Sequence, residues 1–315
     1  MADQASIDKL TARLKKIQTS IEDKIKIIDS TDAKDSVFWA KMRKSLDQDF
    51  EESRIVFSKF LNSEFPKEYS DTIKFQIAKI KKYGAYNTPF NDFINQQNNK
   101  QTISSILNDA NAAFFIGTES GQKTLIRLMS VTQQINIREN EINKAIAEGF
   151  EESGAVYGPL KRLKKDLIEK SVDGKFVTVI DKNGKTRRYT IDYYAELVAR
   201  TKLAEVSTAG VVNTALKYGA DLVQVSAHNT ETEYDAWFEG KIFSLSGNDP
   251  DFELAPDLPP FHPNCKHSIS IVYREALAAQ GTLQKYIDFS NGSVSTHPTR
   301  TSFIPVSERG FNANN

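Results

Sequence analysis

The first thirty residues place apolar side chains three and four residues apart, which is the spacing of one face of an α-helix. The series fills the a and d positions of three to four heptads, and Lys24 interrupts it. The apolar positions are Ile7, Leu10, Leu14, Ile17, Ile21 and Ile28. Such a face packs either against its own domain or against a partner helix in a coiled coil. The pattern favours packing within its own domain.

More helices are predicted in the first half of the chain. The second begins near Thr31 or Asp35 and ends before Pro66, because proline breaks a helix interior. Its aromatic stripe is expected to be core rather than a surface for stacking bases. Residues 87–101 are rich in Asn and Gln and are a candidate linker. Helical patterns resume from Ile103 to Glu148 and from Pro159 to Lys170.

The sequence pattern changes at Gly174. Two β-prone runs flank Asn183-Gly184, a strong hairpin signal. A long helix is predicted from Ile191 to about Tyr218, with Gly219 as its C-terminal cap. Short strands are predicted at 221–227, 241–246 and 267–273.

These patterns predict an α+β protein. A helical N-terminal region (1–173) precedes a small α+β domain (174–275) with short antiparallel strands and one long helix. Residues 276–315 are expected to form a C-terminal extension on the surface.

Charge and composition exclude several classes of protein. Lys+Arg and Asp+Glu both number 41, so a general electrostatic grip on nucleic acid is not expected. One cysteine excludes an internal disulfide. No signal-peptide pattern and no run of about 18 apolar residues occurs, so we expect a soluble protein with no membrane span.

Two familiar catalytic or nucleotide-binding patterns are tested and rejected. The run from Gly117 to Thr124, "GTESGQKT", misses the phosphate-loop spacing by one residue and has Gln122 before the lysine. A loop at a helix start is expected there. Cys265 follows Pro263-Asn264 and enters a strand, which is not the setting of a nucleophilic cysteine.

The stretch "PPFHPNCKHSI" gathers Cys265 with His262 and His267, and His228 ends an earlier predicted strand. Sulfur and imidazole together suit zinc, and Asp235 or Asp257 could add oxygen. The alternative is a hydrogen-bonded corner in which Cys265 packs as a small apolar side chain.

Four segments of the C-terminal half follow one another in a fixed order and spacing. The first is a hairpin and a helix with Arg200-Thr201, and the second is "YGADLVQVSAH". The third is "WFEGKIFSLSG", with Trp237 and Gly240, and the fourth is the closing "HPNCKH" element with Pro263 and Asn264. Together they resemble phage minor capsid proteins of the Mu F-like and minor capsid protein 2-like head-morphogenesis group. Two departures are Lys202, where many relatives have Glu, and "NTETEYDAW", which lacks the Cys-x-x-Cys, or the Arg and second His, of many relatives.

The resemblance implies structural work rather than enzyme activity. It implies a low-copy component of the phage head, assembled in the host cytoplasm and located near the portal protein. Contacts with the major capsid protein, a scaffold or packaged DNA would serve head assembly, DNA packaging or ejection. Arg200 is expected to tie its helix to the closing loop. The alternatives are a nucleic-acid-binding packaging adaptor and a metal-dependent enzyme that uses the His/Cys residues.

Overall fold

The computed structural model describes residues 4–30, 35–82, 90–147, 157–169, 174–180, 184–230 and 233–292. Internal contacts divide the chain into two compact units. The hairpin unit comprises Gln4–Phe60 and Asn111–Glu196. The sheet unit comprises Leu61–Ala110 and the described residues from Leu197 to Gly292. The boundaries cut three long helices, α2, α4 and α6, and none of the three falls near residue 173. The predicted division at that residue stays a prediction.

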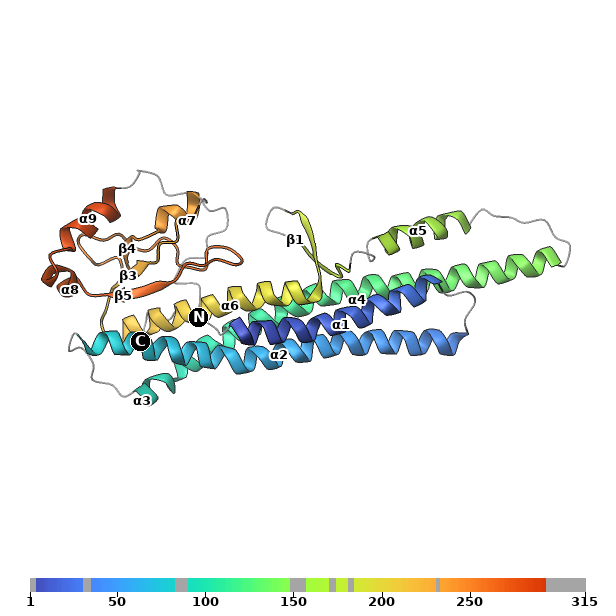
Figure 1. Ribbon diagram of the computed structural model, residues 1–315, viewed down its shortest axis with the longest axis horizontal. Helices are drawn as coiled ribbons and strands as arrows, with labels where there is room; N and C mark the ends of the chain where they lie inside the picture. The colour runs from blue at the N-terminus through green and yellow to red at the C-terminus, as the bar shows by residue number, and fades with distance from the viewer. Residues whose placement is uncertain are drawn as a thin grey trace. The chain divides into compact units, whose positions relative to one another are not determined.

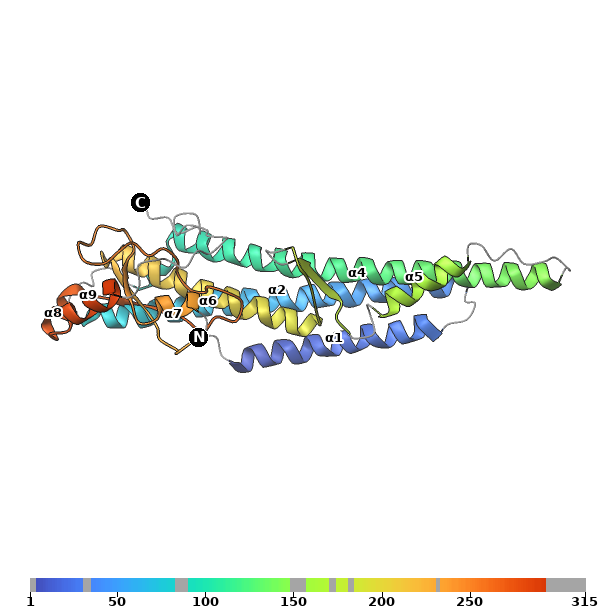
Figure 2. The ribbon, with the colours of Figure 1, turned by 90° about the horizontal axis from the view of Figure 1, so that it is seen from above.

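The hairpin unit is built on α1 (Gln4–Ser30), which runs antiparallel to the first part of α2 (Ser36–Lys81) (Figure 1 and Figure 2). The apolar face predicted for α1 is buried, with Ile25 and Gln18 added to it. Lys24 forms an ion pair with Asp49 of α2. Packing of α1 within its own chain is therefore confirmed. Asp35 begins α2 by accepting a hydrogen bond from Phe38 N at 2.8 Å.

The second part of α4 (Gln97–Ala147) completes the helical core of this unit. Phe57 of α2 stacks on Phe114 of α4 with ring centroids 4.2 Å apart. Both rings are buried, as are Leu46 and Phe50 of the same stripe. The stripe is therefore core at these positions, whereas its other members, Phe38, Met42 and Phe60, are only half-buried. The "GTESGQKT" run lies inside α4, and the expected loop at a helix start was wrong. Its glycines instead allow close packing, because a Cβ on Gly121 would lie 2.2 Å from Phe176 O.

The other elements of the hairpin unit are α5 (Tyr157–Glu169) and a two-stranded ribbon. Strand β1 (Val177–Ile180) pairs antiparallel with β2 (Thr186–Tyr189), which confirms the predicted hairpin. Gln18 of α1 is buried beneath it. Its amide donates to Gly174 O and accepts from Ile191 N, so one side chain links α1 to both ends of the hairpin segment.

The sheet unit contains a three-stranded antiparallel sheet of order β4-β3-β5. Its strands are β3 (Leu222–Val225), β4 (Ile242–Ser244) and β5 (Ile269–Val272), as predicted. They follow α6 (Ile191–Lys217), which ends where Gly219 adopts a φ of +67°. Helix α7 (Glu233–Phe238) lies between β3 and β4, and α8 (Arg274–Ala279) follows β5.

Three helices meet in this unit through a buried polar network. Tyr69 of α2 donates to Asn99 of α4 at 2.7 Å, and Asn213 of α6 donates to Tyr69 at 2.7 Å. Helix α2 also caps the sheet edge, since Gln76 accepts a hydrogen bond from Ile271 N of β5 at 3.3 Å. The sheet therefore rests on helices that are distant in sequence.

Three predictions about element boundaries were wrong. Helix α2 continues through Pro66, because Phe65 and Tyr69 on either side are fully buried and their packing outweighs the lost hydrogen bond. The candidate linker at 87–101 contains α3 (Phe90–Ile94) and the start of α4, and Asn99 is a buried part of the polar network.

The third error concerns the predicted C-terminal extension. Helix α9 (Leu283–Gly292) is not a loose extension, because Leu283, Tyr286 and Ile287 pack on a buried apolar cluster. The remaining tail, 293–315, lies outside the described residues. The α+β class itself is confirmed, with long helices and short antiparallel strands.

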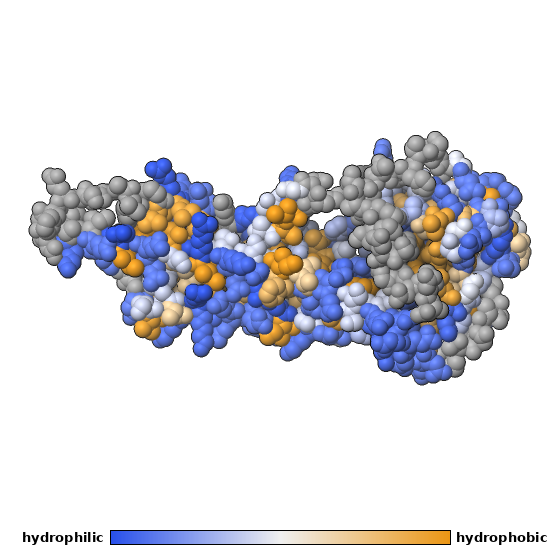
Figure 3. Space-filling view, turned by 180° about the vertical axis from the view of Figure 1, so that it is seen from behind, coloured by the Kyte–Doolittle hydropathy of each residue, from blue (hydrophilic) through white to orange (hydrophobic). Residues whose placement is uncertain are grey.

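Hydrophobic side chains on the surface form small groups separated by hydrophilic ones on the face seen in Figure 3. None of the helices within the described ranges combines the length and apolar character needed to cross a bilayer.

Candidate functional site

The His/Cys-rich stretch lies in the loop between β4 and β5, opposite α7, and all its contacts described here belong to the sheet unit. A tight turn shapes it. Cys265 N donates to His262 O at 3.1 Å. Pro263 fixes its own φ, and Asn264 adopts a φ of +63°, as the third residue of a type II turn does. The Pro-Asn pair thus turns the chain so that Cys265 follows His262 closely in space.

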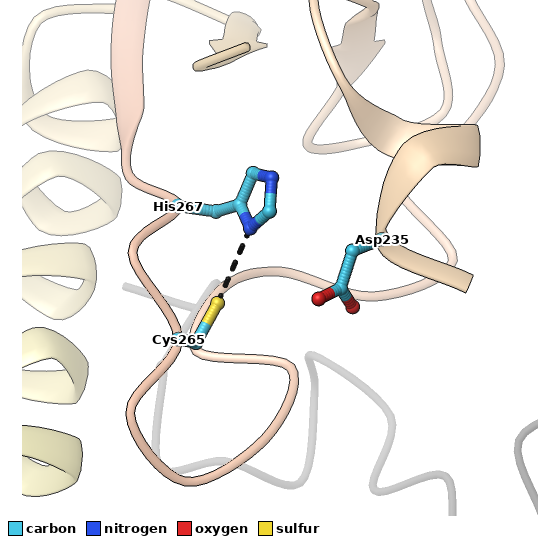
Figure 4. A group of neighbouring side chains, drawn as sticks. All are labelled: Asp235, Cys265 and His267. Atoms are coloured by element: carbon cyan, nitrogen blue, oxygen red, sulfur yellow. Dashed lines mark hydrogen bonds between the residues drawn. The ribbon is translucent and has the colours of Figure 1, made fainter. Parts of the chain in front are cut away.

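Cys265 and His267 face each other. Cys265 Sγ lies 3.4 Å from His267 Nδ1, the contact drawn in Figure 4. Asp235 of α7 directs its carboxylate toward the same space (Figure 4). One ligand atom from each of these three residues lies within 4.8 Å of the other two. We call Asp235, Cys265 and His267 the Asp–Cys–His group.

Asp235 is the most unusual member of this group. Its side chain is 1% exposed, and His262 Nε2 lies 2.6 Å from its Oδ2. Its other oxygen, Oδ1, is buried and has no hydrogen-bond partner among the described residues. Burying a carboxylate oxygen without a partner is costly, so Oδ1 marks a place where a positive ligand would be stabilised.

Glu239 holds His267 from behind. Its Oε1 lies 2.8 Å from His267 Nε2, and its carboxylate also accepts hydrogen bonds from Asn229 N and Thr230 N. Burial alone would raise the pKa of Glu239, but these hydrogen bonds outweigh burial and lower it. A charged Glu239 accepts a hydrogen bond from Nε2–H of His267, which leaves Nδ1 as the acceptor nitrogen that faces Cys265.

The structure brings some of the site residues predicted from sequence together and separates others from them. His262, Cys265 and His267 come together. His228 packs its ring against His267 with centroids 5.1 Å apart, but its Nε2 lies 2.9 Å from Ser226 Oγ. Asp257 accepts a hydrogen bond from Tyr234 at 2.8 Å and lies outside the Asp–Cys–His group. Asp235 is thus the carboxylate that joins the group.

The remaining motif residues make contacts or turns within the fold and lie outside the Asp–Cys–His group. Thr201 bonds Leu197 O within α6 at 2.7 Å. Gly240 has a φ of +74° at the turn from α7 into β4. Trp237 lies under the amine of Lys241, whose Nζ is 3.6 Å from the ring centroid. Helix α6 is bonded to the segment just before the HPNCKH element, where Thr208 donates to Pro259 O at 2.7 Å. A tie from half-buried Arg200 stays a prediction.

The thiol of Cys265 is not prepared for nucleophilic attack. Burial raises its pKa, so the side chain is protonated at neutral pH in the metal-free protein. Cys265 also follows a turn rather than beginning a helix. The arrangement favours a site that binds or stabilises over one that attacks a substrate.

Comparison with known proteins bears on the same segment. Residues 160–280 match the family model described as Phage minor capsid protein 2. The match runs from α5 to the end of α8 and includes the Asp–Cys–His group. No curated protein matches the chain, and no solved structure matches it. Residues 160–280 are thus similar to the family described as Phage minor capsid protein 2.

Proposed function

We propose that this chain is a low-copy component of the phage head that sits near the portal and supports head assembly, DNA packaging or ejection. The observation that carries the proposal is the match of residues 160–280 to a minor capsid family. A capsid family supports a location in the virion and contacts with other virion components. The proposal goes further in two respects: the chain lies near the portal protein, and it serves head assembly, DNA packaging or ejection.

The alternative of a nucleic-acid adaptor receives less support. It would use the basic helix α5, but Lys161 and Lys164 lie within ion-pair distance of Glu139 and Asp29. These pairings reduce the positive charge available to a phosphate backbone. The enzyme alternative is weakened by the protonated Cys265, and a structural family is compatible with a protein that is not an enzyme.

A role in head assembly, DNA packaging or ejection is tested by making particles without the chain. A nonsense mutation in its gene, on the phage that encodes it, is expected to leave major capsid protein synthesis intact. Infectious titre should fall, with heads that are aberrant, empty or unable to deliver DNA. Supplying the chain from a plasmid is the control and should restore titre. Normal titre and normal DNA-filled heads without the chain would contradict a role in assembly, packaging or ejection.

Proximity of the chain to the portal protein is tested separately, in intact wild-type particles. Cross-linking followed by peptide mass spectrometry should join this chain to the portal protein. Cross-links to the major capsid protein alone, spread over the shell, would contradict a portal-proximal location.

A further inference from the structure

We propose that the Asp–Cys–His group binds a zinc ion through Cys265 Sγ, His267 Nδ1 and Asp235 Oδ1. Thiolate, imidazole and carboxylate are the three ligand types that zinc accepts in proteins. The proposal concerns the folded chain itself and does not depend on its role in the virion.

The spacing of the group suits a single ion. Zinc–sulfur and zinc–nitrogen bonds of about 2.3 and 2.0 Å, at a tetrahedral angle, place the two ligand atoms about 3.5 Å apart. Cys265 Sγ and His267 Nδ1 are 3.4 Å apart. The full set fits within 4.8 Å, with the three side chains converging on one space (Figure 4). Only small side-chain adjustments would be needed for all three to reach one ion.

The buried oxygen of Asp235 is an independent sign of a cation. Asp235 is 1% exposed, and Oδ1 has no hydrogen-bond partner among the described residues. A zinc ion at this position would satisfy that oxygen and offset the cost of burying the carboxylate.

Two ligands are held by partners of the kind found around zinc. Glu239 binds Nε2 of His267, the nitrogen that faces away from Cys265, and so forms the carboxylate–histidine pair common behind zinc ligands. His262 Nε2 holds Oδ2 of Asp235 and leaves Oδ1 for the ion. His262 is therefore a positioning residue, and solvent fills the fourth position of the ion.

Buried aromatic rings lie beside the group. Phe261, next to His262, stacks on Phe238 at the end of α7 with centroids 4.5 Å apart. Both rings are 2% exposed. An ion bound by Asp235 of α7 and by two residues of the closing loop would lock these segments together and stabilise the sheet unit.

The experiment uses the full chain, purified under reducing conditions without a metal-binding tag. Zinc per chain is measured by elemental mass spectrometry. After chelation, Zn²⁺ and Co²⁺ are added back separately, and thermal unfolding and the absorption spectrum are recorded. We expect one zinc per chain, a higher melting temperature with Zn²⁺, and a thiolate-to-cobalt charge-transfer band with Co²⁺.

Variants assign the ligands. Cys265→Ser should remove the charge-transfer band, and Asp235→Asn should weaken Zn²⁺ binding by at least about tenfold. Glu239→Gln should weaken it by about 10–100-fold while keeping the band, because Glu239 only orients His267. His228→Asn is the matched control, since His228 touches His267 without offering a ligand, and it should bind Zn²⁺ as the parent chain does.

The parent chain decides the proposal even if a variant fails to fold. Substoichiometric zinc after purification, together with no cobalt band and no change in melting temperature on adding Zn²⁺, would overturn it. Loss of the band in His228→Asn as well as in Cys265→Ser would overturn the ligand set. Neither result would affect the assignment to the virion, which is measured in particles.

Discussion

At the scale of single residues, Lys241 resembles Asp235 in that its ionisable side chain is buried. Its side chain is 2% exposed, and its Nζ has no hydrogen-bond partner among the described residues. Its recorded contact is with the ring of Trp237, a cation–π interaction that offsets part of the cost of burial. Burial lowers the pKa of Lys241, and the negative charge of Glu253 opposes this shift in part.

This burial predicts how stability depends on pH. Because the pKa of Lys241 is lower in the folded state than in the unfolded state, the unfolded chain binds more protons between the two pKa values. Lys241 therefore penalises folding at neutral pH, and the penalty declines as pH rises toward about 10.5. Lys241→Met should be about 1 kcal/mol more stable than the parent at pH 7, with the difference shrinking in alkali.

Urea unfolding at a series of pH values measures this effect. Lys285→Met, at an exposed position on α9, is the control and should follow the parent chain. A Lys241→Met variant that is less stable than the parent at every pH would show that the cation–π contact outweighs burial.

The sequence predicted part of the site at this scale. His262, Cys265 and His267 are neighbours in the chain, so their proximity follows from a short loop. Asp235 was one of two acids considered, and the sequence could not separate it from Asp257, because only the packing of α7 decides which carboxylate faces the loop. Glu239 was not predicted. It lies 28 residues before His267 in the chain, and no local sequence pattern indicates that the two side chains meet.

At the scale of elements, close approaches of backbone decide where helices pack. Gly121 lies inside α4, where alanine would ordinarily stabilise a helix by about 1 kcal/mol. A Cβ there would lie 2.2 Å from Phe176 O, a backbone atom that cannot rotate away. Gly121→Ala should therefore destabilise the hairpin unit by about 1–3 kcal/mol.

Thermal unfolding checks the sign. Gly292→Ala is the control, because a Cβ at Gly292 meets nothing within 4 Å, and it should be neutral or slightly stabilising. Stabilisation by Gly121→Ala would mean that α4 and the segment before β1 are not in contact.

A second element-scale prediction concerns the bond between α6 and the segment just before the HPNCKH element. Thr208 is buried on α6 and donates to Pro259 O, whereas Thr214, also buried on α6, donates to Gly210 O within the helix. Thr208→Val leaves the Pro259 carbonyl without this donor and should cost about 1–2 kcal/mol. Thr214→Val should cost less stability, because Gly210 O lies one turn away in the same helix and the lost hydrogen bond joins no separate segments. Equal losses in urea unfolding would argue against a special role for the Thr208 tie.

Local signals explain which elements were predicted correctly. The β1–β2 hairpin, the glycine cap after α6 and the three strands of the sheet are encoded by neighbouring residues, and these three features were confirmed. Pro66 and the Asn-rich segment at 87–101 misled the prediction, because buried contacts of Phe65, Tyr69 and Asn99 override local preference.

At the scale of the whole molecule, the chain is two compact units joined by three helices that run through both. Periodicity along the sequence predicted the helices but not this division, because a boundary inside a continuous helix leaves no Pro- or Gly-rich linker. Residues 160–280, which match the minor capsid family, include parts of both units. The family segment is therefore not one contact-defined unit.

We propose that the chain is a minor component of the phage head, and its copy number in the particle is the direct test of this role. Quantitative mass spectrometry of purified, DNA-filled particles would compare this chain with the portal and major capsid proteins. We expect between a few and some tens of copies per particle, in constant ratio to the portal protein. Absence from mature particles, or a copy number equal to that of the major capsid protein, would contradict it.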